Sequence, residues 1–279
     1  MEVTNKLIEQ INEKLEKHYV TISQVKKNNV EKKGITIIPK EGNRTVCPTV
    51  YVDDISTFSE VMEIVRAAAD IEAPVLDIEK LTSREYITNN LRAAVISRDN
   101  VILEDEDVVY RPFLDMAIIY RIVVPAPATG QIGTILLKKS MLENSGIKEV
   151  ELYEIAKANR EYQVKTLFEM LYDITGVDYE AKYKDDAPEV YVVTSLDRRL
   201  GASILFTDLF KEVGEKISEK VYVIPCSIHE ILLVPCDERI DIDGLRELVK
   251  YVNATEVSLE DKLTDSVYCL DENGISIAA

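Results

Sequence analysis

The chain has 279 residues, 46% of them hydrophobic and 30% charged, so it can bury a sizeable core in one large domain or two smaller ones. Its formal net charge of −17 disfavours direct nucleic-acid binding, because phosphate backbones require clustered cations. No apolar run approaches the roughly 18 residues of a membrane span, the N-terminus lacks a secretion-signal pattern, and 4 scattered cysteines suit a reducing compartment. We therefore expect a cytoplasmic globular protein without membrane contact.

The first part of the chain predicts a β-rich lobe with helices laid on it. Thr57 and Glu60 form a capping box that opens a helix, because hydroxyl and carboxylate satisfy the free amides of the first turn. The acidic segment 104–107 marks the boundary that we expect between a lobe at 1–107 and a lobe at 108–279. The other expected elements of the first lobe are a helix with apolar positions Leu7, Ile8, Ile11 and Leu15, strands at 20–25, 34–39, 45–52 and 93–97, and a short helix at 83–89.

The second lobe contains an internal similarity. Residues 133–146 align without gaps over 201–214, with glycines at both ends and apolar pairs inside. Each segment follows a predicted strand, at 116–124 and 189–194, so both predict a hairpin whose second strand leads into a helix. We expect an α+β fold of antiparallel sheet layers with helices packed on them, and a duplicated hairpin–helix unit in the C-terminal two thirds. The prolines of the loop at 125–130 should prevent regular pairing there.

Further elements follow from periodicity and turn residues. Thr166 and Glu169 form a second capping box, and 176–186 is a polar connector. A hairpin is expected around His229, and the cluster at 271–274 predicts a turn between two closing strands. The apolar helix positions are Leu152, Ile155 and Ala156, then Leu167, Met170 and Leu171, and finally Leu245, Leu248, Val249 and Val252.

His229, one of only 2 histidines, is the main candidate for catalysis. Ser227, His229 and Glu230 supply a nucleophile, a base and an orienting carboxylate. On a strand, however, Ser227 and His229 would stand about 7 Å apart with Glu230 on the opposite face, so a triad needs a tight turn. The alternative is that these polar side chains satisfy the backbone of their own turn.

Cys226, His229 and Cys236 have the ligand chemistry of a zinc site. If 221–225 pairs with 231–235, Cys236 lies about 23 Å from His229 at ~3.3 Å per residue, so the two cannot share an ion. We expect no metal and no cofactor, with the cysteines in structural roles.

Charged residues in apolar surroundings are candidates for binding. Asp115 precedes an apolar strand, Arg121 lies toward its far end, and Arg198 is a possible partner in a charged turn. Pairing with Arg198 or Glu230, or simple exposure to water at the strand ends, is the structural alternative that we favour.

Four segments carry a resemblance to a known family: 111–120 (RPFLDMAIIY), 151–159 (ELYEIAKAN), 200–206 (LGASILF) and 222–235 (YVIPCSIHEILLVP). In this order they resemble an uncharacterised bacterial domain-of-unknown-function family with a Pro-Ser-Ser-Ile-His-Glu-type segment. This chain matches it from Pro225 to Glu230, with Cys226 in place of the first serine, which argues against an essential role for that position. The resemblance implies a shared fold and a cytoplasmic setting, and brings no activity, cofactor or catalytic residue.

No nucleotide-binding, metalloprotease or serine-hydrolase motif occurs in the sequence, which favours a non-enzymatic protein. We expect a binding or accessory module that acts through contacts with another protein. The first alternative is a hydrolase that uses His229. The second is an acidic mimic of DNA, or an inhibitor, directed at a basic DNA-handling protein, although 104–107 and 185–186 are the only tight acidic clusters.

Overall fold

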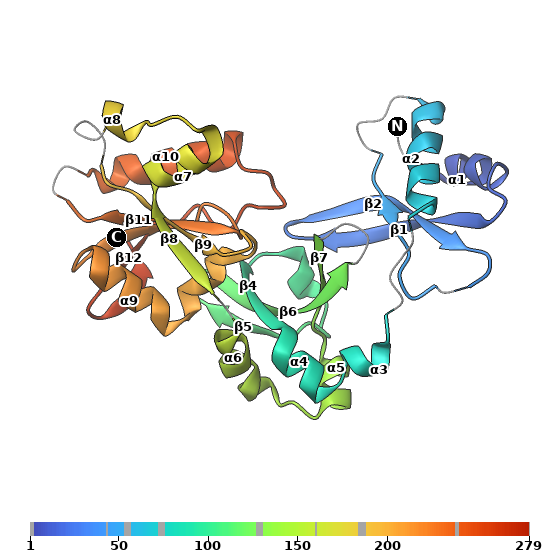
Figure 1. Cartoon of the computed structure of the whole chain (residues 1–279), viewed down its shortest axis with the longest axis horizontal. Helices are drawn as coiled ribbons and strands as arrows, with labels where there is room; N and C mark the ends of the chain where they lie inside the picture. Colours follow the sequence, from blue (N-terminus) through green and yellow to red (C-terminus); the bar gives the residue numbers. More distant parts are fainter. Residues whose placement is uncertain are drawn as a thin grey trace.

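The protein is described by a computed structural model that covers residues 3–42, 44–52, 57–71, 76–126, 131–159, 161–183, 188–237 and 240–278. Its strands form three sheets, and their pairs are antiparallel throughout these ranges. The sheets follow one another in chain order from one end of the molecule to the other, with helices packed on them (Figure 1). The α+β prediction is confirmed.

The first sheet has the order β1-β2-β3 and its own core, which includes Val20, Ile35 and Val65. Both halves of the predicted capping box at Thr57 and Glu60 are present. The strand expected at 45–52 is confined to two residues. The elements are α1 (Asn5–Asn12), β1 (His18–Lys27), β2 (Val30–Pro39), β3 (Thr49–Val50) and α2 (Phe58–Ala69).

The second sheet has the order β4-β6-β5, with β7 also paired to β6. β4 and β6 lie on either side of residue 107, so the expected lobe boundary falls between two paired strands; the division into lobes stays a prediction. The elements are α3 (Ile78–Leu81), α4 (Arg84–Asn90), β4 (Leu91–Ser97), η1 (Val101–Glu104), β5 (Tyr110–Phe113), β6 (Met116–Ala126), β7 (Gln131–Leu136), α5 (Lys139–Ser145) and α6 (Glu149–Ala158).

The expectation that prolines end the pairing of the β6–β7 hairpin is wrong. Pro125 is paired with Ile132, and the register continues to Ala126. The pairing with β4 has already ended at Ile122, so this end of β6 has a neighbour on one side only, where a missing N–H is tolerated. Residues 127–130 of the loop lie outside the described ranges.

The third sheet has the order β13-β12-β10-β11-β9-β8. The predicted hairpin around His229 is confirmed, with Val221 opposite Pro235, as are the capping box at Thr166 and the closing strand pair. The elements are β8 (Tyr162–Thr166), α7 (Leu167–Thr175), α8 (Glu180–Tyr183), β9 (Tyr191–Ser195), η2 (Gly201–Phe206), α9 (Asp208–Ile217), β10 (Val221–Ile224), β11 (Glu230–Pro235), α10 (Ile242–Thr255), β12 (Tyr268–Asp271) and β13 (Gly274–Ile277).

The duplicated hairpin–helix unit is not formed. Its first copy contains strand β7 and helix α5, whereas residues 201–206 of the second copy form the 3₁₀ helix η2. All six residues of η2 are buried, which does not suit a strand with one exposed face. Gly201 donates its N–H to the His229 carbonyl at 2.9 Å, and a Cβ there would lie 2.6 Å from the Ser195 nitrogen. This close approach turns the chain away from β9.

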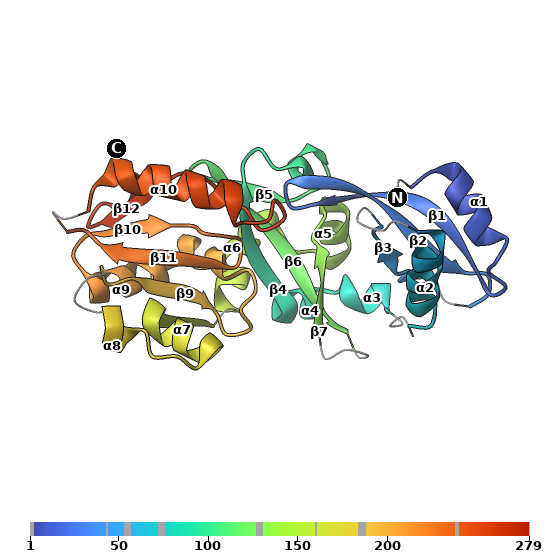
Figure 2. The same cartoon turned by 90° about the horizontal axis from the view of Figure 1, so that it is seen from above.

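The second and third sheets share one core, which runs from Ile87 on α4 to Leu270 on β12. The first sheet reaches them through the tip of its β1–β2 hairpin (Figure 2). There Asn28 donates to the Glu260 carbonyl at 2.8 Å, and Asn29 donates to the Lys262 carbonyl at 2.6 Å. Asn100, 2% exposed, donates to the side-chain oxygens of both asparagines. A polar cluster of three amides therefore joins the three sheets.

Among the described residues, no helix combines the length and the apolar character that a membrane crossing requires.

Candidate functional site

The imidazole of His229 lies at the turn between β10 and β11, with both nitrogens engaged. Nδ1 accepts a hydrogen bond from the Leu200 backbone N–H at 3.1 Å, and Nε2 lies 3.2 Å from Asp261 Oδ1. Because a backbone N–H can only donate, Nδ1 carries no proton, and the neutral ring donates from Nε2 to Asp261. Neither nitrogen can take a proton from a serine in this arrangement.

The other two catalytic candidates lie beside His229 without facing its ring. Ser227 Oγ accepts from the His229 backbone N–H at 3.0 Å, and no described hydrogen bond joins it to the imidazole. Glu230 begins β11, opposite Thr194. Ser227 thus serves the backbone of its own turn, which is the alternative that the sequence left open.

The thiols near His229 are poorly suited to hold a metal. Burial raises the pKa of Cys226 to about 12, with the Glu230 carboxylate adding to the shift, so the thiol keeps its proton at neutral pH. Cys236 follows the far end of β11, where its N–H donates to the Lys220 carbonyl at 2.9 Å. In the part of the chain that the structure describes, no three His, Cys, Asp or Glu side chains form a metal-binding group.

Residues 195–200, which supply the Leu200 N–H to the imidazole, are linked to one another by short-range hydrogen bonds. Arg198 and Leu200 both have left-handed backbones, with φ of 55° and 54°. Ser195 Oγ accepts from the Arg199 N–H at 2.9 Å and lies 2.6 Å from Asp197 Oδ1, and Asp197 pairs with Arg92 of β4. His229 therefore connects the loop after β9, the β10–β11 turn and the segment around Asp261.

Asp115 is a structural acceptor between the second and third sheets. Its Oδ2 accepts hydroxyl hydrogen bonds from Thr264 at 2.9 Å and Ser266 at 2.8 Å, and its Oδ1 accepts from Tyr268. Tyr268 is 0% exposed, and burial followed by the Asp115 hydrogen bond raises the pKa of its hydroxyl. Asp115 is therefore partnered by hydroxyls rather than by Arg198 or Glu230.

Arg121 and Arg198 lie on different parts of the molecule. Arg121 on β6 stands opposite Arg92 of β4 and donates weakly to Thr134 Oγ1 at 3.4 Å. Its Nε is buried without a partner among the described residues, and burial lowers the pKa of its guanidinium. Arg198 is exposed and lies 3.9 Å from Asp173 of α7. The structure brings neither arginine to Asp115 or Glu230.

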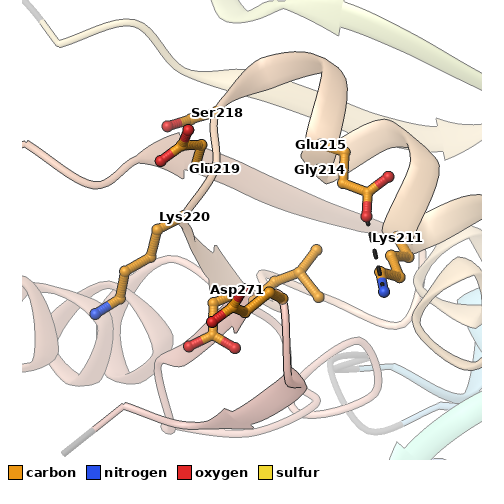
Figure 3. Close-up of a pocket in the computed structure, with 9 residues that line it drawn as sticks. Lys211, Gly214, Glu215, Ser218, Glu219, Lys220 and Asp271 are labelled. Carbon is orange, nitrogen blue, oxygen red and sulfur yellow. Dashed lines mark ion pairs between the residues drawn. The ribbon is translucent and has the colours of Figure 1, made fainter.

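A hollow of about 520 Å³ lies between the C-terminal half of α9 and the β12–β13 turn (Figure 3). Lys211, Glu215, Glu219, Lys220 and Asp271 contribute side chains of both signs, and Lys211 makes a loose ion pair with Glu215 at 3.7 Å. The hollow is open, and its two lysines stand against four carboxylates, Glu272 included, so the lining combines both signs with an acidic excess and selects no particular ligand.

Helix α10 exposes an apolar stripe, which we define as Leu248, Tyr251 and Val252. Their exposed fractions are 55%, 66% and 37%. They are spaced i, i+3 and i+4, so they form one face of the helix. Three neighbouring apolar side chains, spread over a little more than one turn of an outer helix, exceed the single exposed residues that are normal in a monomer.

The sequence places Leu245, Leu248, Val249 and Val252 on one face of α10, whereas the rotation of the helix in the structure exposes Leu248 and Val252. Two polar anchors decide it. Asn253 is 5% exposed and donates to the Thr264 carbonyl at 2.9 Å, and Arg246 donates to the Ala278 carbonyl. Val249 stays buried, while the stripe turns outward. The pattern shows that the helix is amphipathic, but the carbonyls that fix its rotation, those of Thr264 and Ala278, lie outside the helix.

The chain is thus an α+β protein of three antiparallel sheets, and no group of three potential metal ligands occurs among the residues described. It belongs to a family of unknown function, DUF5688, whose family model matches residues 1–272, so the resemblance noted in the sequence is confirmed. No curated protein and no solved structure matches the chain.

Proposed function

We propose that the protein is a non-enzymatic binding module that recognises another protein through the apolar stripe of α10. The observation that carries this proposal is the exposure of Leu248 and Tyr251 on a helix whose other side is anchored to the third sheet. A firmly held helix presents its side chains without a large ordering cost on binding, and aromatic and aliphatic side chains are typical anchors of interfaces.

The charges around the stripe define the partner. Asp243 and Glu247 lie on the same helix with side chains 83% and 75% exposed, each in an ion pair with a cation of α10, Arg246 and Lys250, and Glu256 follows its C-terminus. The whole chain carries a net charge of −17, so two copies would repel each other as they approached. The stripe therefore fits a partner of a different kind, with an apolar centre and lysines or arginines around it.

Binding by the stripe can be tested by capture with the intact tagged protein from a lysate of the cells that produce it. The test variant is Leu248→Asp with Tyr251→Asp, and the matched control is Tyr172→Asp with Ile174→Asp on α7, where the side chains are 57% and 65% exposed. We expect a stoichiometric partner that the control retains and the α10 variant loses. Equal capture by both variants, or equal loss, would contradict the proposal.

The ionic part of the proposal has its own test. If acidic residues around the stripe meet a basic partner, the association rate should fall as salt rises, because the Debye length shortens from about 10 Å at 0.1 M to about 3 Å at 1 M. A partner whose binding is insensitive to salt would contradict the basic character assigned to it. The contribution of the apolar stripe is tested separately by the α10 and α7 variants.

A further inference from the structure

A second hollow, of about 260 Å³, lies where the second and third sheets meet. Its walls come from β5 and α6 on one side and from η2, α9 and the β12–β13 hairpin on the other. Figure 1 shows these elements side by side at the junction. Pockets for small ligands occur preferentially at such junctions between packed units. We call this hollow the junction pocket.

Aromatic side chains gather in the junction pocket. Phe113, Phe206 and Phe210 line it, which is three of the 5 phenylalanines in the chain, and Tyr153 completes the wall. The rings of Tyr153 and Phe206 meet edge to face, with centroids 5.4 Å apart. The Tyr153 hydroxyl donates to the Phe206 carbonyl at 2.5 Å, so the orientation of this wall is set before any ligand arrives.

The charged residues that line the junction pocket are both cations. Arg111 lies over the Tyr153 ring, 5.0 Å from its centroid, and makes no ion pair with a described residue. Among the described residues, Lys211 makes a loose, exposed ion pair with Glu215 and no other. No aspartate or glutamate is among the described residues that line the pocket, although the chain contains 50 of them. An open hollow with a mainly apolar lining, two cations and no carboxylate among its described residues favours an anion with an apolar body.

The size of the pocket limits that body. A cavity of about 150 Å³ holds benzene, so 260 Å³ accommodates one ring or two fused rings. We propose that the junction pocket binds a small aromatic carboxylate, with its rings among Phe113, Phe206 and Phe210 and its carboxylate toward Arg111 and Lys211. This site is separate from the α10 stripe and does not depend on the proposed function.

The probe for this site is 2-naphthoate, with 2-naphthamide as the uncharged control of nearly equal shape. The chain has no tryptophan, so naphthalene fluorescence is measured without an indole background. We expect 2-naphthoate to bind the intact protein with a dissociation constant in the high micromolar range, and the amide to bind about tenfold more weakly because it lacks the charge-assisted contacts. Absence of 2-naphthoate binding at about 1 mM would overturn the proposal.

Variants distinguish this pocket from the polar hollow beside it, which shares Lys211 and Leu270. Arg111→Gln with Lys211→Gln should abolish the preference for carboxylate over amide. The matched control is Lys220→Gln, which removes a cation that lines only the polar hollow. A urea midpoint unchanged from wild type confirms that each variant is folded. Equal loss of binding in Lys220→Gln, or an unchanged preference in the double variant, would overturn the assignment.

Discussion

Replacing Asp115 by alanine should strongly destabilise the junction of the second and third sheets. Three hydroxyls donate to this carboxylate. Thr264 and Ser266 are half-buried, so their hydroxyls can bond to water instead, and each lost hydrogen bond should cost about 0.5–1 kcal/mol of stability. The hydroxyl of the fully buried Tyr268 has no such replacement, so the loss of its acceptor should cost about 1–3 kcal/mol. We expect Asp115→Ala to lower the free energy of unfolding by about 3–4 kcal/mol in urea titrations.

A matched control and a double-mutant cycle make this prediction specific. Asp99 is exposed, and its side chain makes no hydrogen bond among the described residues, so Asp99→Ala should change stability by less than about 0.5 kcal/mol. Tyr268→Phe should cost about 1–2 kcal/mol in the wild type but should raise stability beside Asp115→Ala, because it removes the buried hydroxyl that has lost its acceptor. Additive costs for the two changes would refute the reasoning.

Three more predictions concern other parts of the fold. Hydrogen bonds from Lys32 and then Lys27 lower the pKa of Glu260 below its ordinary 4.5. The ionised carboxylate therefore stabilises the docked hairpin tip fully above pH 4.5, and this contribution is lost as the pH falls through the lowered pKa. The amide NMR signals of Asn28 should shift between about pH 6 and pH 3, and unchanged signals would disprove this coupling. Gly201→Ala should cost about 3 kcal/mol in urea titrations, since its Cβ meets backbone atoms that cannot yield, and a neutral effect would show that the loop relaxes. Alkylation of Cys226 at neutral pH should be far slower than that of a denatured control because its pKa is raised to about 12, and equal rates would contradict the burial assigned to it.

The elements that could be predicted are those whose signals are local. The capping boxes at Thr57 and Thr166 each place two interacting side chains three residues apart, and both are formed. The hairpin around His229 has two short apolar runs, at 221–225 and 231–235, on either side of a polar turn. Strand β8 was missed because it is a five-residue edge strand with an exposed Val164, which gives little hydrophobic pattern.

The elements that could not be predicted depend on distant partners. The rotation of α10 is set by Asn253 and Arg246, which bond to carbonyls 11 and 32 residues away. The hydrogen bonds of the His229 ring nitrogens depend on Leu200 and Asp261, which lie 29 and 32 residues away, and neither residue belongs to a recognisable sequence motif. The sequence could single out the histidine as unusual, but its neighbours show that it connects loops.

The most direct test of the central claim, that the protein binds a partner through α10, uses the captured partner in purified form. Its affinity would be measured for the wild type, for Leu248→Asp with Tyr251→Asp, and for the α7 control. We expect the α10 variant to bind at least about a hundredfold more weakly, as the loss of two anchor side chains implies, and the control to bind like the wild type. An α10 variant that binds as tightly as the wild type would contradict the account.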